Sequence, residues 1–439
     1  MGALPCRRYN DLHHIQALIL ASTCSQGHHS RMTQLRSLDL TLRVVTPMAC
    51  GNADFLAEVR PPSFRGVSRL WLRILLGGIF GEDYQSVRTV ENLVFGDTTR
   101  RSSFAVRTLD EPATGPLPID PAEAPGLAYL YYTLYRARRN AILPNEHFRL
   151  RLQTSPTPFP NTTVRDITVD ADLAWKLVAA SFWLTIWLGG VSARVRRGAG
   201  SLAFVRQPEA WPEALPSPVV RATTPQQLAE EIAAHLHQLR RAFGWQPVAQ
   251  VDALPAGNLL HPDAFDVYVL DRVYPTWHAA LDAVGQSFQA FRLRQPDDYA
   301  TVRGVLTGQG AQQPSVKRAI FGLPLSFFFS SLYRELTAQG VAEREARQRA
   351  SGTLGLRSGT GRMSPLWVQV TELAGVDPAY VVRLSLLRSR FEDESLVFRP
   401  QDRALAPVNM RPPDDYTHAQ EWFEHLQQTV APLLPAKVS

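Results

Sequence analysis

The chain has 439 residues, of which 45% are hydrophobic and 20% are charged, a balance typical of a globular protein with two or three domains. A net charge of +6 and an isoelectric point near 9.4 favour an acidic partner, although so small an excess makes the placement of the arginines more informative than their number. The three cysteines have no C-x-x-C spacing, which argues against a disulfide framework and for a reducing compartment.

Residues 1–34 differ in composition from the rest and are interpreted as a leader outside the folded domains, or as residues ahead of a true start at Met32. A signal peptide is not favoured, because the apolar run here is short and is interrupted by Gln16. Zinc binding by Cys24 with His28 remains an alternative.

Residues 37–46 alternate apolar and polar side chains, which predicts a half-buried strand. Apolar residues then recur at helical spacing over residues 67–75, which predicts an amphipathic helix that ends at Gly77 and Gly78. Further strands are expected at residues 103–108, 147–153 and 202–205, and an apolar helix at residues 172–188. The longest apolar run, residues 177–191, is shorter than the roughly 20 residues that cross a bilayer, so we expect a soluble cytoplasmic protein.

The order strand, helix, strand, strand, helix, strand predicts a ferredoxin-like domain at residues 35–206, with an antiparallel sheet covered by two helices. Residues 207–224 are proline-rich and are interpreted as a linker or insertion. Residues 225–439 predict a second α+β domain, less regular than the first. Its expected elements are helices at 225–243 (with Thr224 as N-cap), 277–291 and 415–433, strands at 366–370 and 381–387, and a mobile loop at 354–361.

Residues 188–202 carry glycines and arginines with no acidic residue between them. Glycine lets another backbone come close, and successive N–H groups in such a loop form a concavity for anions that arginines reinforce. The loop therefore predicts contact with nucleic acid through Gly189, Gly190, Arg194, Arg196, Arg197, Gly198 and Gly200. A dinucleotide fingerprint is excluded because the helix precedes the loop and the strand follows it. A glycine-rich connection packed against its own sheet is the open alternative.

Arg65, Arg69 and Arg73 are four residues apart, so they form one stripe along the helix predicted there. Such a stripe could follow a phosphate backbone. No acidic residue lies between Arg60 and Glu82, which favours this interpretation, while a solvated basic face is the alternative.

Together these segments resemble the first RAMP subunits of the type III-B CRISPR effector, the Cmr complex, within the RAMP superfamily. The resemblance runs from about residue 35 to residue 395. Its motifs lie at residues 60–73, 93–96, 188–202, 317–324 and 362–366. Ser192 and Ala199 depart from the family pattern, and the departure at 199 removes a base-stacking aromatic residue.

The resemblance implies two ferredoxin-like (RRM-like) domains and a non-catalytic subunit at one end of an RNA-guided antiviral complex. It implies contact with RNA near the 3′ side of the guide and its target, and with other RAMP subunits, without a cofactor, a metal or a membrane. The implied RNA-binding residues include Arg318 and Arg362 of the two C-terminal motifs, beside those of the stripe and the glycine loop.

Two other functions remain open. A metal-independent endoribonuclease of this fold would use a histidine as general acid or base. The available histidines are His147, His235, His237, His261, His278, His418 and His425, none of them in the glycine loop or the stripe. Sequential carboxylates at 297–298, 392–394 and 414–415 are typical of solvated turns, so we expect no catalysis. A purely structural subunit could instead use residues 327–329 as a partner surface, although a buried strand or helix is the simpler interpretation.

Overall fold

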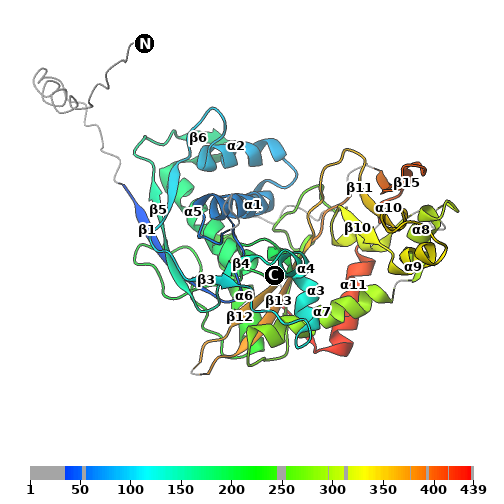
Figure 1. The fold of residues 1–439 in the computed structure, drawn as a ribbon. Helices are drawn as coiled ribbons and strands as arrows, with labels where there is room; N and C mark the ends of the chain where they lie inside the picture. The colour runs from blue at the N-terminus through cyan, green and yellow to red at the C-terminus, as the bar shows by residue number, and fades with distance from the viewer. Residues whose placement is uncertain are drawn as a thin grey trace, which may run out of the picture. The chain divides into compact units, whose positions relative to one another are not determined.

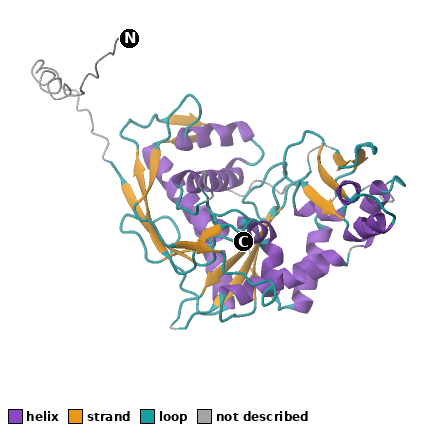
Figure 2. Cartoon of the chain, in the orientation of Figure 1, coloured by secondary structure: helices purple, strands orange, loops and turns teal. Residues whose placement is uncertain are grey.

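The computed structural model describes residues 35–51, 56–244, 254–294, 296–310, 315–375, 377–391, 395–413 and 415–436, which belong to one compact unit (Figure 1). The expectations for Cys24, His28 and Met32 lie outside the described residues. The fold is α+β, as the sequence predicts, and it contains several antiparallel sheets (Figure 2).

The first sheet has the antiparallel order β2-β5-β1-β8, the arrangement of a ferredoxin-like domain. Alternation in β1 buries Leu38, Leu40 and Leu42, each at most 1% exposed, against the helices. Phe64 of the first helix meets Phe148 of the sheet edge-to-face, with ring centroids 5.7 Å apart. The elements of this domain are β1 (Ser37–Val44), α1 (Pro61–Phe80), β2 (Phe104–Thr108), β5 (His147–Thr154), α5 (Ala171–Leu184) and β8 (Leu202–Phe204).

The predicted end of α1 is wrong. The helix continues through Gly77 and ends at Gly81, whose φ of +62° suits glycine. A Cβ at Gly77 would lie closer than 3.0 Å to the side chain of Leu259, so this glycine serves close packing inside the helix.

A second helix, α2 (Tyr84–Phe95), packs on α1 and was missed from the sequence (Figure 1). It begins at Asp83, whose carboxylate accepts a hydrogen bond of 3.1 Å from the Ser86 amide. The smaller elements of this half, also missed, are β3 (Thr114–Pro116), α3 (Pro125–Leu130), α4 (Tyr132–Arg136), β4 (Asn140–Ile142), β6 (Thr162–Val164) and β7 (Ile167–Val169).

The helix α5 continues as a π-helical turn, Thr185–Gly189. By length and composition, Ala171–Gly189 is the one candidate membrane span among the described residues, but 78% of it is buried inside the protein. It packs on α1, where the hydroxyls of Ser68 and Thr185 lie 3.0 Å apart. These contacts are those of a core helix.

The second sheet repeats the strand order of the first, as β12-β13-β9-β16. One helix follows its first strand and another precedes its last, so the second ferredoxin-like arrangement predicted from the sequence is also present. Its elements are β9 (Phe265–Leu270), α7 (Trp277–Leu293), β12 (Leu366–Glu372), β13 (Tyr380–Leu387), α11 (Thr417–Thr429) and β16 (Leu433–Pro435).

A third sheet, of order β10-β11-β14-β15, explains why this half reads as irregular in sequence, because its strands come from two insertions with their own apolar core. The mobile loop expected at residues 354–361 is wrong in its first part, since β11 contains Leu354 and pairs with β14. Phe327 and Phe329 are buried, while Phe328 is 49% exposed. The first insertion comprises α8 (Pro296–Leu306), a 3-10 turn (Lys317–Phe321), β10 (Leu325–Phe328), α9 (Ser330–Ala338), α10 (Glu343–Arg349) and β11 (Ser351–Leu356). The second comprises β14 (Leu396–Pro400) and β15 (Val408–Met410).

The helix α6 (Pro225–Ala242) starts at Thr224, as the sequence predicts. The Thr224 hydroxyl accepts a 3.2 Å hydrogen bond from the amide of Gln227.

The two sheets share buried contacts. The Val370 amide of β12 donates to Ser201 over 3.1 Å, and the buried Gln369 side chain donates to the carbonyl of Gly189. The glycine loop is therefore fixed between the sheets.

Candidate nucleic-acid interface

The glycines of the loop at residues 188–202 pack against the protein itself. Gly190 has a φ of +127°, and a Cβ there would lie 2.7 Å from the carbonyl oxygen of Gly200. Gly198 and Gly200 also have positive φ, and a Cβ at either would approach within 3.0 Å of the protein's own atoms. A Cβ at Gly189 would meet the indole of Trp71. The tightly packed connection left open by the sequence is thus present, and it holds the arginines between these glycines in a fixed position.

Arg194 crosses from the loop to the end of α3. It takes up a left-handed backbone conformation, with φ +67°. Its Nε and Nη2 donate to the carbonyl oxygen of Leu130, over 3.1 and 2.8 Å. A half-buried guanidinium is thereby joined to a backbone oxygen and, within the described part of the chain, to no carboxylate.

Arg196 and Arg197 contact the second half of the chain. The guanidinium of Arg196 lies 4.7 Å from the ring centroid of Trp367, and that of Arg197 lies 5.1 Å from the centroid of Phe288. Arg197 also donates to the Ser364 hydroxyl over 3.4 Å. These contacts orient both cations without neutralising their charge.

A cleft of about 490 Å³ collects these side chains, and we call it the arginine cleft. It is formed where the glycine loop meets residues 321–325 and 361–364, so three of the motifs that carry the family resemblance line one site. Leu323 and Arg362 exchange backbone hydrogen bonds of 2.8 and 3.1 Å, which hold the last two segments together. No Asp, Glu or His is among the described lining residues. Its arginines are Arg194, Arg196, Arg197, Arg292 and Arg362.

Two arginines of the cleft have pKa values lowered by their surroundings. Burial lowers the pKa of Arg196 to about 10, and burial together with neighbouring arginines lowers the pKa of Arg197 to about 9. The Nε atoms of Arg196 and Arg292 are buried without a hydrogen-bond partner among the described residues. An anion entering the cleft would supply both the missing charge and the missing acceptors.

Arg292 was not predicted from the sequence, where it reads as an ordinary basic residue in the last turn of a helix. Its Nη1 donates to the hydroxyl of Tyr129 over 2.9 Å, which aims the side chain from α7 toward α3.

The two C-terminal arginines expected to bind RNA have different surroundings. Arg362 lines the cleft, lies 3.6 Å from the ring centroid of Phe391, and donates to the Tyr416 hydroxyl over 2.9 Å. Arg318 is not among the lining residues. Its Nε donates to the buried carboxylate of Asp298 over 3.1 Å, which neutralises it.

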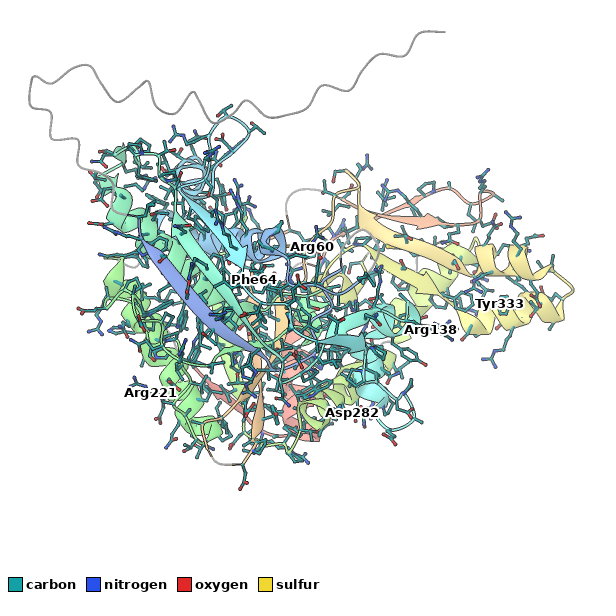
Figure 3. The ribbon with its side chains drawn as sticks, turned by 60° about the vertical axis from the view of Figure 1, so that its left-hand side comes forward. Arg60, Phe64, Arg138, Arg221, Asp282 and Tyr333 are labelled. Atoms are coloured by element: carbon teal, nitrogen blue, oxygen red, sulfur yellow. The ribbon has the colours of Figure 1, made fainter. Side chains whose placement is uncertain are left out.

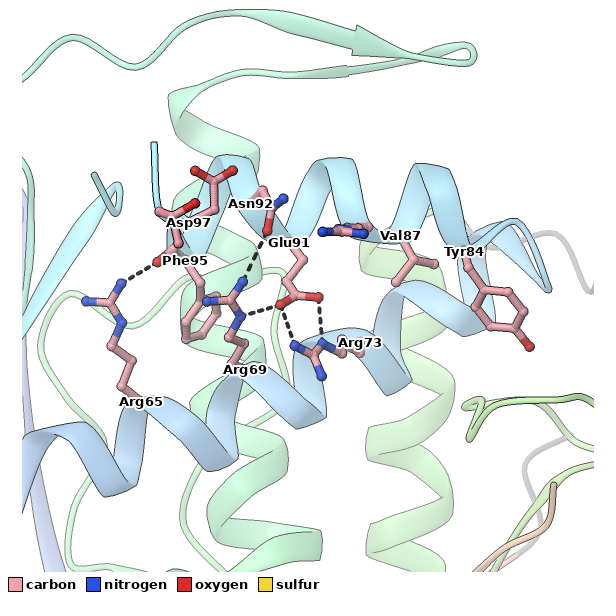
Figure 4. Close-up of a pocket in the computed structure, with 12 residues that line it drawn as sticks. Arg65, Arg69, Arg73, Tyr84, Val87, Glu91, Asn92, Phe95 and Asp97 are labelled. Carbon is pink, nitrogen blue, oxygen red and sulfur yellow. Dashed lines mark hydrogen bonds and ion pairs between the residues drawn. The ribbon is translucent and has the colours of Figure 1, made fainter. Parts of the chain in front are cut away.

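The stripe on α1 lines a separate cavity of about 720 Å³ between α1 and α2 (Figure 4). Arg65 donates to the carbonyl of Phe95, while Arg69 and Arg73 both donate to Glu91, the latter over 2.6 and 2.8 Å. Burial raises the pKa of Glu91, but the hydrogen bonds from Arg73 and Arg69 outweigh it and leave the pKa lowered. The acid that pairs with the stripe therefore comes from the helix that was missed.

His235 and His418 are buried among aromatic or acidic side chains. His235 packs edge-on against the stacked rings of Trp183 and Trp187, with ring centroids 5.6 and 4.7 Å away, and burial lowers its pKa to about 4. His418 is buried and lies 2.9 Å from a carboxylate oxygen of Glu421. Within the described ranges, no group of three or more His, Cys, Asp or Glu could hold a metal ion.

Residues 41–203 match the family model described as the RAMP superfamily. Two curated proteins are similar to part of the chain. The chain is 31% identical over 154 residues to the CRISPR system Cmr subunit Cmr1-1 of Pyrococcus furiosus, covering 34% of this chain and 41% of the relative. It is 29% identical over 174 residues to Cmr1-2 of the same organism, covering 37% of this chain and 91% of that protein. The alignment thus spans about two fifths of the first relative's length.

The crystal structure of Cmr1 from Pyrococcus furiosus in its apo form resembles the whole chain, with a TM-score of 0.53 and 20% identity. It covers 91% of this chain and 98% of that one. This likeness shows a common fold through both sheets. The family resemblance predicted from the sequence is confirmed.

Proposed function

We propose that the chain is a non-catalytic, RNA-binding subunit of a type III-B CRISPR effector complex in the cytoplasm. The carrying observation is the arginine cleft, where five arginines from distant parts of the sequence meet without a carboxylate among the described lining residues. The relatives named as Cmr subunits support the assignment to that complex. The proposed partners are guide RNA, target RNA and the other RAMP subunits.

The cleft suits phosphate better than bases. A guanidinium offers a planar fork of N–H donors that matches two phosphate oxygens, and half-burial strengthens the interaction. Contacts of this kind hold the backbone in register without reading sequence, which base pairing with a guide supplies in RNA-guided complexes.

The proposed roles follow from position. Arg194, Arg196, Arg197, Arg292 and Arg362 contact phosphate, and the glycines at 189, 190, 198 and 200 hold the loop that presents three of them. Arg318 pairs with Asp298 and so helps to hold the segment at residues 321–325, which lines the cleft.

The stripe of Arg65, Arg69 and Arg73 is a second candidate surface. Its first role is to hold α1 to α2 through Glu91, so an RNA phosphate there shares the arginines with that carboxylate.

Strand cleavage is not part of the proposal. Metal-independent cleavage needs a general base within reach of a ribose hydroxyl, and no histidine or carboxylate lines the described cleft. The purified protein should leave bound RNA intact in the presence and absence of divalent metal. Cleavage abolished by a single His→Ala change would contradict the proposal.

The first test measures affinity for single-stranded RNA at one fixed salt concentration. The variant replaces Arg194, Arg196 and Arg197 with alanine. The control replaces Arg149, Arg151 and Arg303, which pair with carboxylates elsewhere, and so removes equal charge. We expect weaker binding only in the first variant, provided that both melt near the wild-type temperature. Equal binding by both, with normal assembly on coexpression with the other subunits, would favour the purely structural function.

A further inference from the structure

Two tyrosines of α4 expose their rings to solvent. Tyr132 is 56% exposed and Tyr135 is 37% exposed. They are three residues apart on one short helix, so they lie on the same face. The guanidinium of Arg136 lies 5.8 Å from the ring centroid of Tyr132, which adds a cation beside the rings.

Arg138 follows α4 at a backbone position that glycine would adopt with less strain. Arg138, labelled in Figure 3, has a φ of +48°. Its amide donates to the carbonyl of Tyr135 over 3.0 Å, and the next amide donates to Leu134 over 3.2 Å, which closes the helix. A left-handed conformation strains any residue with a Cβ. The chain therefore keeps an exposed arginine three residues after Tyr135 in a conformation that glycine takes up more readily.

These cations carry no carboxylate partner. Neither Arg136 nor Arg138 makes an ion pair with any residue that the structure describes. The surface thus presents two flat rings and two unpaired guanidinium groups, the combination that single-stranded nucleic acids bind through their bases and phosphates.

The helix that precedes the tyrosines, α3, contacts two arginines of the arginine cleft. The carbonyl of Leu130, at the end of α3, accepts both hydrogen bonds from Arg194, and α4 begins two residues later. Tyr129 of the same helix accepts from Arg292, another lining residue. The end of α3 thus holds two of the arginines that line the cleft, and the chain continues directly from there into the exposed tyrosines.

We propose that α4 is a stacking platform for unpaired bases of the single-stranded RNA whose phosphates bind in the arginine cleft. The inference rests on the proposed function and adds a binding mode to it. Bases stack on Tyr132 and Tyr135, while Arg136 and Arg138 bind the phosphates between them. Duplex RNA, whose bases are already stacked, gains nothing from this platform.

The test compares single-stranded RNA with a duplex of the same sequence across a salt series. Replacing Tyr132 and Tyr135 with alanine should lower affinity for the single strand by at least about tenfold, with the salt slope unchanged because no charge is lost. The matched control replaces both with phenylalanine, which keeps the rings and should bind as the wild type does.

A second variant separates binding from folding. Arg138→Gly relieves the left-handed conformation, so its melting temperature should equal or exceed that of the wild type. Its salt slope for single-stranded RNA should be shallower by about 0.7, the contribution of one phosphate contact.

The outcomes also distinguish this inference from the proposed function. If the tyrosine variant binds normally while the Arg194, Arg196 and Arg197 variant loses RNA, the platform is refuted and the cleft stands. If neither variant affects binding, both are refuted. If the tyrosine variant loses a protein partner but keeps RNA affinity, α4 is a protein-docking surface and the inference is wrong.

Discussion

Gly200→Ala measures how far the glycine loop is built for the fold. Two costs follow from the structure. A φ of +69° costs an alanine about 1 kcal/mol. The added Cβ would also meet the carbonyl oxygen of Val191 and lie 2.6 Å from the Cβ of Ser192, an overpacking worth about 1–3 kcal/mol. The total loss of unfolding free energy should be about 2–4 kcal/mol.

Gly244→Ala is the matched control. Gly244 has a φ of +63°, but no atom of the described residues lies within 4 Å of the position of its missing Cβ. It should lose only the conformational cost of about 1 kcal/mol, so the difference between the two variants isolates the clash. Urea denaturation followed by tryptophan fluorescence reports both losses. Equal stability of the two variants, with weaker RNA binding in Gly200→Ala alone, would refute the reasoning and return the glycines to direct contact with RNA.

Two further predictions concern buried ionisable groups. Glu91→Gln leaves Arg69 and Arg73 without their carboxylate and should lower the unfolding free energy by about 1–3 kcal/mol. Because it also frees these arginines for phosphate, RNA affinity should rise with a steeper salt slope; unchanged affinity would show that the stripe serves the fold alone. The pKa of His235 falls from 6.5 to about 4 on folding, so the folded state takes up this proton less readily than the unfolded state. The contribution of His235 to the free energy of unfolding is therefore complete above pH 6.5 and is lost as pH falls toward 4. His235→Phe should keep the contacts with Trp183 and Trp187 and flatten the dependence of unfolding free energy on pH over that window by about 3 kcal/mol; an unchanged profile would show that His235 does not titrate there.

Local periodicity predicts the strands of the first sheet and α1, because each of these elements has one apolar face, and the apolar composition of residues 172–188 predicts α5. The predicted end of α1 was wrong because Gly77 makes room for the side chain of Leu259, which is distant in the sequence and which no local pattern reveals. The helix α2 could have been found, since Val87, Val90 and Val94 follow helical spacing. The third sheet was not predicted, because its strands come from two separate insertions in the second half of the chain.

The candidate site was only partly predictable. The sequence identifies Arg194, Arg196 and Arg197 by composition, but their meeting with Arg292 and Arg362 depends on how the two sheets pack. The pairing of the stripe with Glu91 could not be predicted either, because the helix α2 that carries Glu91 was missed.

The central claim, that RNA phosphates bind in the arginine cleft, is tested most directly by the salt dependence of binding. The measurement is the slope of log affinity against log salt concentration for single-stranded RNA, in the wild type and in the Arg194, Arg196 and Arg197 alanine variant. Three lost phosphate contacts should make the slope shallower by about 2, while the Arg149, Arg151 and Arg303 control keeps the wild-type slope. An identical slope in all three proteins would contradict the claim.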